Sequence, residues 1–209
     1  MDTNIDKHKI NIPDGNDPLN PVRIYTDGVF DCFHFGHARL LEQIKKMFKH
    51  VYLLVGVTSD EDTIREKGKI LMNEKERADC VSHCKWADEI IHDCPWICDW
   101  DFFEKYNIHY IAHDPLPYKC GDIDDVYGKF KDAGRFLATR RTEGISTTDL
   151  IVRIIKDYDE YTLRSINRGT PLKELNLDKT AIFIAEMINK DDTEFAQNLK
   201  KSLLEKLQN

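Results

Sequence analysis

Short apolar runs alternate along the chain with segments in which apolar residues recur at helical spacing. The runs predict strands, because they are brief, rich in β-branched and aromatic residues, and bounded by polar turns. The run at 51–57 is apolar throughout, which is typical of a strand that is buried on both faces. Strands are expected at 22–26, 51–57, 89–92, 109–112 and 135–138.

Helical segments fill the intervals between these strands. Apolar side chains share one face of a helix expected over 38–48, and Asn73 can cap a second helix that runs to about Cys84. Shorter helices are expected near 99–106 and 124–132. This alternation predicts an α/β fold with a parallel sheet flanked by helices. In such open sheets, ligands bind beyond the carboxyl ends of the strands.

The two ends of the chain differ from this alternating middle. Residues 1–21 are rich in Asn, Asp and Pro and predict a mobile arm before a main domain at 22–169. The sequence from Ser146 to Asp149 resembles a capping box and predicts one long helix through Tyr161. We expect residues 170–209 to form a C-terminal helical extension. One face of it carries Phe195, Leu199, Leu203 and Leu207, which favours packing or a partner over a membrane surface.

Length and charge limit the classes of function. The chain has 209 residues with 41% hydrophobic content, enough for one substantial core. It has no apolar run of about 18 residues and no signal-peptide pattern at its start, so we expect a soluble cytoplasmic or nuclear protein. Its net charge of −7 argues against a nucleic-acid partner, because a phosphate backbone requires a basic face.

Four cysteines suggest a zinc site at first sight. Cys80, Cys84, Cys94 and Cys98 form two pairs with three residues between the members of each pair. Zinc ligands usually have tighter or loop-borne spacing, and thiols in an apolar helical pattern commonly fill a core. Reduced structural thiols are therefore the favoured interpretation.

The segment Asp27-Gly28-Val29-Phe30-Asp31-Cys32-Phe33-His34-Phe35-Gly36-His37 lies where the first strand turns into a helix. Its two glycines would let backbone N–H groups at the helix N-terminus approach an anion. The two histidines, one helical turn apart, could donate to phosphate oxygens of a nucleotide. The alternative is an ordinary turn in which the histidines only satisfy backbone groups.

Three further motifs follow in register. They are Met72-Asn73-Glu74-Lys75-Glu76-Arg77, Ala112-His113-Asp114 and Arg141-Thr142-Glu143-Gly144-Ile145-Ser146-Thr147. Together with the opening segment, their order and spacing resemble the signature set of the cytidylyltransferases, over about 23–177. Within that family the likeness is to members that act on phosphocholine.

The resemblance implies a Rossmann-like nucleotidylyltransferase fold and transfer of the cytidylyl group of CTP to phosphocholine, in phosphatidylcholine biosynthesis. The products would be CDP-choline and pyrophosphate. It further implies Mg²⁺ accompanying CTP, a homodimer, and membrane contact only through a regulatory segment that is absent from this chain. We expect no metal ligands from the protein itself.

The resemblance also implies roles for individual residues. The nucleophilic phosphate is already ionised at neutral pH, so the enzyme must supply orientation and cationic donors rather than a general base. The expected catalytic donors are His34, His37, Lys67 and Arg141. The expected nucleotide-binding residues are Val29, Phe30, His37, Lys67, His113, Asp114, Tyr118, Arg140, Arg141, Thr142 and Ile145. The expected phosphocholine-binding residues are Asp27, Lys67, Trp96, Tyr118 and Tyr127.

The chemistry of the second substrate distinguishes the remaining alternative functions. A trimethylammonium group has no N–H to donate, so its site should combine aromatic faces with a carboxylate. Phosphoethanolamine would favour hydrogen-bond acceptors, and glycerol 3-phosphate is a further possible substrate. A non-catalytic nucleotide-binding regulatory module is the third class, but it would need no cluster of cationic donors.

The loop 119–125 departs from the family pattern. Its residues differ from those of relatives, although its spacing is similar.

Overall fold

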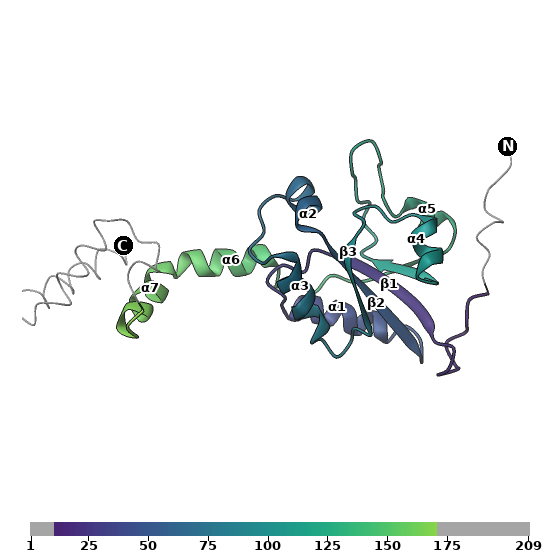
Figure 1. Cartoon of the computed structure of the whole chain (residues 1–209), viewed down its shortest axis with the longest axis horizontal. Helices are drawn as coiled ribbons and strands as arrows, with labels where there is room; N and C mark the ends of the chain where they lie inside the picture. The colour runs from purple at the N-terminus through teal and green to yellow at the C-terminus, as the bar shows by residue number, and fades with distance from the viewer. Residues whose placement is uncertain (1–10, 171–209) are drawn as a thin grey trace, which may run out of the picture. The chain divides into compact units, whose positions relative to one another are not determined.

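The computed structural model describes residues 11–170 (Figure 1). The chain divides after Thr147 into two compact units, and the first of them carries the sheet. Within the described range, no helix is long and apolar enough to cross a membrane.

The first unit is built on a parallel sheet of five strands in the order β3-β2-β1-β4-β5. This confirms the predicted fold class. The register pairs Val22 with Val51 and Gly28 with Val57, so the ends of the two central strands coincide. The strands are β1 (Val22–Gly28), β2 (Val51–Thr58), β3 (Glu89–Cys94), β4 (Tyr110–His113) and β5 (Phe136–Ala138).

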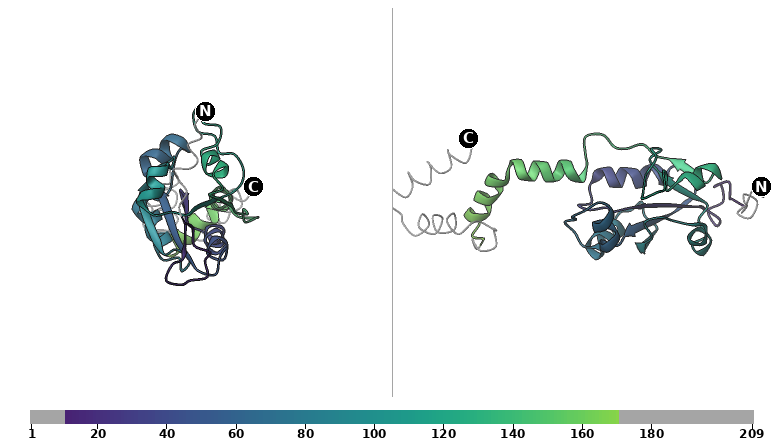
Figure 2. Two further views of the ribbon diagram at one scale, coloured as in Figure 1. Left: turned by 90° about the vertical axis from the view of Figure 1, so that its right-hand side faces the viewer. Right: turned by 90° about the horizontal axis from the view of Figure 1, so that it is seen from above.

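Helices cover both faces of this sheet (Figures 1 and 2). One hydrophobic cluster includes Leu41 of α1 (Phe35–Lys45) and Val81 of α3 (Glu74–Ser82). A second cluster, on other side chains of the sheet, includes residues of α4 (Trp100–Lys105) and α5 (Gly128–Asp132). β2 is buried along nearly its whole length, as its continuous apolar run predicts.

One helix was not expected from the sequence. α2 (Asp60–Glu66) begins after Ser59, whose side chain accepts a hydrogen bond from the Asp62 N–H. The acidic residues of its first turn suit the positive end of the helix dipole. The helix is short and polar, so it has no apolar stripe that periodicity could detect.

The prediction of one long helix after Ser146 is wrong. The structure contains α6 (Thr147–Lys156) and a separate helix, α7 (Tyr158–Asn167). Asp157 lies between them, and its carbonyl accepts the first hydrogen bond of α7 from Tyr161. Asp is among the residues favoured at a helix N-cap, so it is a suitable residue at the start of a new helix.

Residues 11–20 contain no helix or strand. The chain nevertheless contacts the sheet unit there, because the Gly15 carbonyl accepts a hydrogen bond of 2.9 Å from His50 N–H. The rest of the predicted arm, 1–10, lies outside the described residues, as do 171–209 and the apolar face expected there.

Candidate active site

Two histidines cap the N-terminus of α1. The His34 Nδ1 accepts from Gly36 N–H at 3.1 Å, and the His37 Nδ1 accepts from His34 N–H at 3.3 Å. This is a capping box made of imidazoles, and it starts the helix at Phe35, three residues before the expected position. The rings stack with their centroids 3.8 Å apart. The alternative in which the histidines satisfy backbone groups is therefore correct as far as the Nδ1 atoms are concerned.

The same hydrogen bonds decide where the ring protons lie. A nitrogen that accepts a hydrogen bond carries no proton, so each neutral ring holds its proton on Nε2. Burial lowers the pKa of His37 to about 4, with the neighbouring His34 and Lys67 adding to the effect. His37 is therefore a neutral Nε2–H donor at physiological pH. Such a donor suits a phosphate oxygen without adding a cation to the helix N-terminus.

The lowered pKa of His37 predicts a pH dependence of folding stability. As pH falls below the ordinary value of 6.5, the unfolded chain takes up a proton that folded His37 refuses until about pH 4. We expect the wild type to lose about 1–2 kcal/mol of unfolding free energy between pH 7 and pH 5 through this group. The measurement is denaturant unfolding at both pH values, compared with His37→Gln.

His37→Gln is the matched control because glutamine keeps the side-chain acceptor of the capping box and does not titrate. All other titrating groups are common to both proteins and cancel in the comparison. The same pH dependence in both proteins would contradict this assignment.

The turn between β1 and α1 has a strained backbone. Phe30 and Cys32 adopt positive φ angles of 56° and 46°, a region that side chains other than glycine rarely occupy. Each such residue costs about 1–3 kcal/mol and persists only where its surroundings enforce it. Strain of this kind is concentrated at functional sites.

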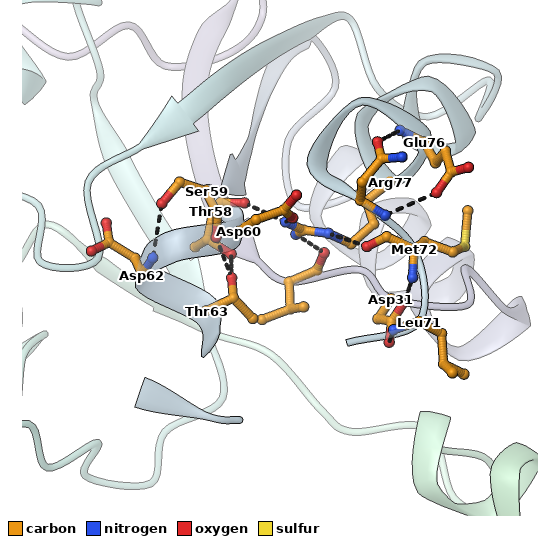
Figure 3. Close-up of polar contacts among 12 residues, drawn as sticks. Asp31, Thr58, Ser59, Asp60, Asp62, Thr63, Leu71, Met72, Glu76 and Arg77 are labelled. Carbon is orange, nitrogen blue, oxygen red and sulfur yellow. Dashed lines mark hydrogen bonds and ion pairs between the residues drawn. The ribbon is translucent and has the colours of Figure 1, made fainter. Parts of the chain in front are cut away.

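Buried polar groups enforce that turn (Figure 3). The Asp31 carboxylate accepts hydrogen bonds of 2.9 Å from the N–H groups of both Leu71 and Met72. The Asp31 carbonyl in turn accepts a hydrogen bond of 2.9 Å from the Thr147 hydroxyl. The turn is thus tied to two segments that are remote in sequence.

Arg77 is the centre of this network and is completely buried. Its guanidinium donates to the carbonyls of Met72, Val29 and Thr58 at 3.1, 2.7 and 2.8 Å. It also forms an ion pair of 2.7 Å with Asp60, at the start of α2 (Figure 3). Arg77 therefore joins the turn after β1, the end of β2 and the helix that precedes Lys67.

An open pocket lies where β1, β2 and β4 end. This is the edge of the sheet at which the sequence predicts a ligand. All five residues expected to bind phosphocholine line it, together with Val29 and His113, which were expected to bind the nucleotide. The lining is Asp27, Gly28, Val29, Thr58, Lys67, Trp96, His113, Tyr118 and Tyr127.

A carboxylate forms the floor of the pocket. Asp27 is only 8% exposed, and its Oδ1 accepts a hydrogen bond of 2.9 Å from the Tyr127 hydroxyl. The Cys98 thiol lies 3.9 Å from the other carboxylate oxygen. Burial raises the pKa of Asp27, while His113, the Tyr127 hydrogen bond and Lys67 act in the opposite direction. Both Asp27 oxygens therefore already have donors from the protein.

Aromatic rings and one ammonium group form the walls. Trp96 and Tyr118 lie with ring centroids 6.3 Å apart, and His113 stacks on Tyr127 at 4.6 Å. The Lys67 ammonium lies within 6 Å of the Trp96 and Tyr118 ring centroids. It also interacts electrostatically with His37, and so connects this pocket to the histidine pair.

Comparison with known proteins identifies the family of this fold and site. The family model described as cytidylyltransferase-like matches residues 25–153, which is more than half of the chain. The chain belongs to the cytidylyltransferase-like family. The family resemblance of the four motifs is thereby confirmed.

Named relatives of this cytidylyltransferase-like chain include enzymes for both amino alcohols. A probable choline-phosphate cytidylyltransferase of Schizosaccharomyces pombe is 51% identical over 164 residues, 78% of this chain and 45% of that protein. Choline-phosphate cytidylyltransferase A of Mus musculus is 52% identical over 157 residues, 75% and 43% of the two chains. Ethanolamine-phosphate cytidylyltransferase of Arabidopsis thaliana is 41% identical over 139 residues, 65% and 32%. The chain spans about half the length of the choline-phosphate relatives that it matches.

Two further expected nucleotide-binding residues, Arg140 and Ile145, lie beside α1. The Gln43 side chain of α1 accepts from the N–H of Arg140 at 3.0 Å and donates to its carbonyl at 3.3 Å. Ile145 is buried against Gly36, where an added Cβ would lie 2.8 Å from an Ile145 methyl carbon. The cytidylyltransferase-like motif at 141–147 is therefore held beside the histidine cap, with Arg140 and Arg141 exposed.

The cysteine pairs of this cytidylyltransferase-like chain lie in different environments. Cys84 packs against the cluster that contains α1 and α3, whereas Cys94 and Cys98 belong to the other cluster. Among the described residues, no group of three or more His, Cys, Asp or Glu side chains is arranged to hold a metal ion.

Sequence reasoning missed several residues that shape the site. They are Asp31, Thr58, Asp60, Arg77 and Cys98. The signal for two of them was present, because Asp31 and Arg77 lie inside the quoted motifs. Their roles depend on hydrogen bonds to distant segments, and spacing along the chain does not reveal those.

Proposed function

We propose that this chain is the catalytic part of a choline-phosphate cytidylyltransferase. It would transfer the cytidylyl group of CTP to phosphocholine, giving CDP-choline for phosphatidylcholine synthesis and releasing pyrophosphate. The observation that carries the proposal is the pocket in which Asp27 and the aromatic rings of Trp96, Tyr118 and Tyr127 come together. Carboxylate and aromatic faces are what a quaternary ammonium group requires.

The state of Asp27 favours choline over ethanolamine. A primary ammonium has three N–H donors and gains most from acceptors with open lone pairs. The Asp27 oxygens already accept from Tyr127 and face Cys98. A trimethylammonium group needs only the negative charge and the aromatic faces. Glycerol 3-phosphate has no cation and would leave the Asp27 charge without a partner. The named relatives agree, since the choline-phosphate enzymes are about ten percentage points more similar than the ethanolamine-phosphate enzyme.

The mechanism follows from charge. A phosphate oxygen of phosphocholine attacks the α-phosphorus of CTP and forms a new P–O bond. The bond from the α-phosphorus to the pyrophosphate oxygen breaks, and pyrophosphate leaves. His34 and His37 donate Nε2–H groups to the CTP phosphates, and Arg141 adds positive charge from the motif beside α1. Lys67 stands between the two phosphates and reduces their repulsion.

Mg²⁺ accompanying CTP would neutralise part of the triphosphate charge. Its ligands would be chiefly phosphate oxygens and water. We further propose that the catalytic unit works as a homodimer. Sedimentation velocity of the purified chain tests this.

One substrate panel tests the activity. The protein is incubated with CTP and Mg²⁺ and offered phosphocholine, phosphoethanolamine or glycerol 3-phosphate, and pyrophosphate release is measured. We expect phosphocholine to give the highest kcat/KM. Turnover of another substrate with greater kcat/KM would contradict the choline assignment. A folded protein without turnover of any would favour a nucleotide-binding regulatory module.

The same assay tests the cation pocket. Trp96→Ala is expected to raise the KM for phosphocholine about 3- to 30-fold, because a cation–π contact contributes about 0.5–2 kcal/mol. The KM for CTP should change less than about twofold. Trp96→Phe is the matched control, since it retains an aromatic face. Equal effects of Trp96→Ala on both KM values would exclude Trp96 as a cation contact.

A further inference from the structure

The Lys67 side chain lies in the pocket that is proposed above to receive the substrate cation. Its Nζ is 5.7 Å from the Trp96 ring centroid and 5.8 Å from that of Tyr118. Both distances fall within the ~6 Å range of cation–π attraction. The rings come from segments far from Lys67 in sequence, so the tertiary fold creates this contact. The contrast is Lys85, which lies over the ring of its sequence neighbour Trp86 at 4.5 Å.

The charges around Lys67 are those that suit a bound cation. Desolvation lowers the pKa of its ammonium group, and the carboxylates of Asp27 and Asp114 oppose that shift. Aromatic faces and the Asp27 carboxylate are also the features proposed above for the trimethylammonium group. Two cations therefore compete for one small pocket.

We propose that the Lys67 ammonium occupies the cation pocket in the ligand-free protein, and that the trimethylammonium group of phosphocholine displaces it toward the phosphates. The inference rests on the proposed function and adds an order of events to it. Arrival of the correct cation releases the catalytic lysine. A phosphate that carries no cation leaves Lys67 in the pocket and away from the reaction.

The local backbone allows such a movement of the side chain alone. Lys67 caps the C-terminal end of α2, and its N–H donates to the Thr63 carbonyl at 2.8 Å. The next residue, Gly68, also donates to carbonyls of α2. The backbone is thus fixed, while the four-carbon chain of the lysine side chain is flexible. The charge of Lys67 also acts on His37, which links the ammonium electrostatically to the phosphate side of the site.

Binding of free choline tests the proposal without any chemical step. Choline is titrated calorimetrically into the wild type, Lys67→Gln and Lys85→Gln. Lys67→Gln should bind choline about 3- to 10-fold more tightly than the wild type, because no cation must be displaced. It should bind phosphocholine less tightly, because the phosphate loses its partner. Lys85→Gln, which removes the same charge from a lysine over a tryptophan outside the pocket, should change both affinities less than about twofold.

A spectroscopic measurement separates displacement from simple charge repulsion. In the ligand-free protein, the ε-methylene protons of Lys67 should resonate upfield because of the Trp96 and Tyr118 ring currents. Added choline should return them to ordinary positions, and Trp96→Ala should abolish the upfield shift. The absence of that signal in Lys67→Gln assigns it.

The failures of the inference and of the proposed function can be told apart. Equal choline affinities of the wild type and Lys67→Gln, or a Lys67 signal without an upfield shift, would overturn the inference while phosphocholine turnover stands. If none of the proteins binds choline or phosphocholine, the inference falls together with the cation pocket. Turnover in the substrate panel then decides on the activity separately.

Discussion

Arg77→Leu is expected to lower the free energy of unfolding by about 3–5 kcal/mol, because buried carbonyl groups lose their donor at about 1–3 kcal/mol each. The guanidinium is completely buried and serves three carbonyl groups and Asp60. Leucine fills part of the space but leaves the carbonyls of Val29 and Thr58 without their donors, and each buried unsatisfied group is costly. Urea unfolding followed by circular dichroism measures the loss.

Asp60→Asn is the control for the charge alone. Asp60 is partly exposed, so loss of its charge should cost no more than about 1 kcal/mol. Arg77→Lys should fall between the two, because a single ammonium cannot reach all four acceptors. A loss below about 1 kcal/mol for Arg77→Leu would show that the network contributes little to folding.

The largest effect on activity is expected from the histidine pair. His34→Asn and His37→Gln should each lower kcat about 10²- to 10³-fold, the usual effect of removing one donor to transition-state charge. Both replacements keep a side-chain acceptor for the helix cap, as the favoured N-cap residue Asn and the capping-box residue Gln do. What they remove is the Nε2–H donor on the far side of each ring.

Three measurements separate a loss of catalysis from a loss of CTP binding or of stability. Steady-state kinetics reports kcat, direct titration reports CTP affinity, and thermal unfolding reports the cap. We expect CTP affinity to fall less than about tenfold and the unfolding temperature to stay near that of the wild type. His34→Ala should lose both activity and stability, because it removes the cap as well. Wild-type kcat in either amide variant would exclude that histidine from catalysis.

The strands and the opening turn could be predicted from the sequence because their signals are local. An apolar run such as 51–57 has few alternatives to a buried strand, and the glycines at the end of β1 and in the first turn of α1 mark the junction between them. α2 was not predicted because a short polar helix has no periodic apolar face. The long helix was wrong because the apolar spacing continues through Asp157, although that residue starts a new helix.

The residues of the candidate site could be predicted from the sequence, but the hydrogen bonds that hold them in place could not. The residues expected around the cation come from several segments, and the fold brings Asp27, Trp96 and Tyr127 to one pocket. No spacing rule gives the hydrogen bonds of Asp31 or Arg77, since their partners are backbone groups of distant loops. Nor could the sequence show that both His34 and His37 use Nδ1 for the helix cap.

The strained turn after β1 has a consequence for the growing polypeptide on the ribosome. The bonds that hold it join residues 40 to 116 positions apart, from Asp31 to Leu71, from Val29 to Arg77 and from Asp31 to Thr147. Phe30 and Cys32 hold positive φ angles that residues other than glycine rarely adopt. A nascent chain that has emerged through α1 therefore carries the phosphate-site residues without their geometry. The nucleotide site is completed only after the segment that ends at Thr147 has been synthesised.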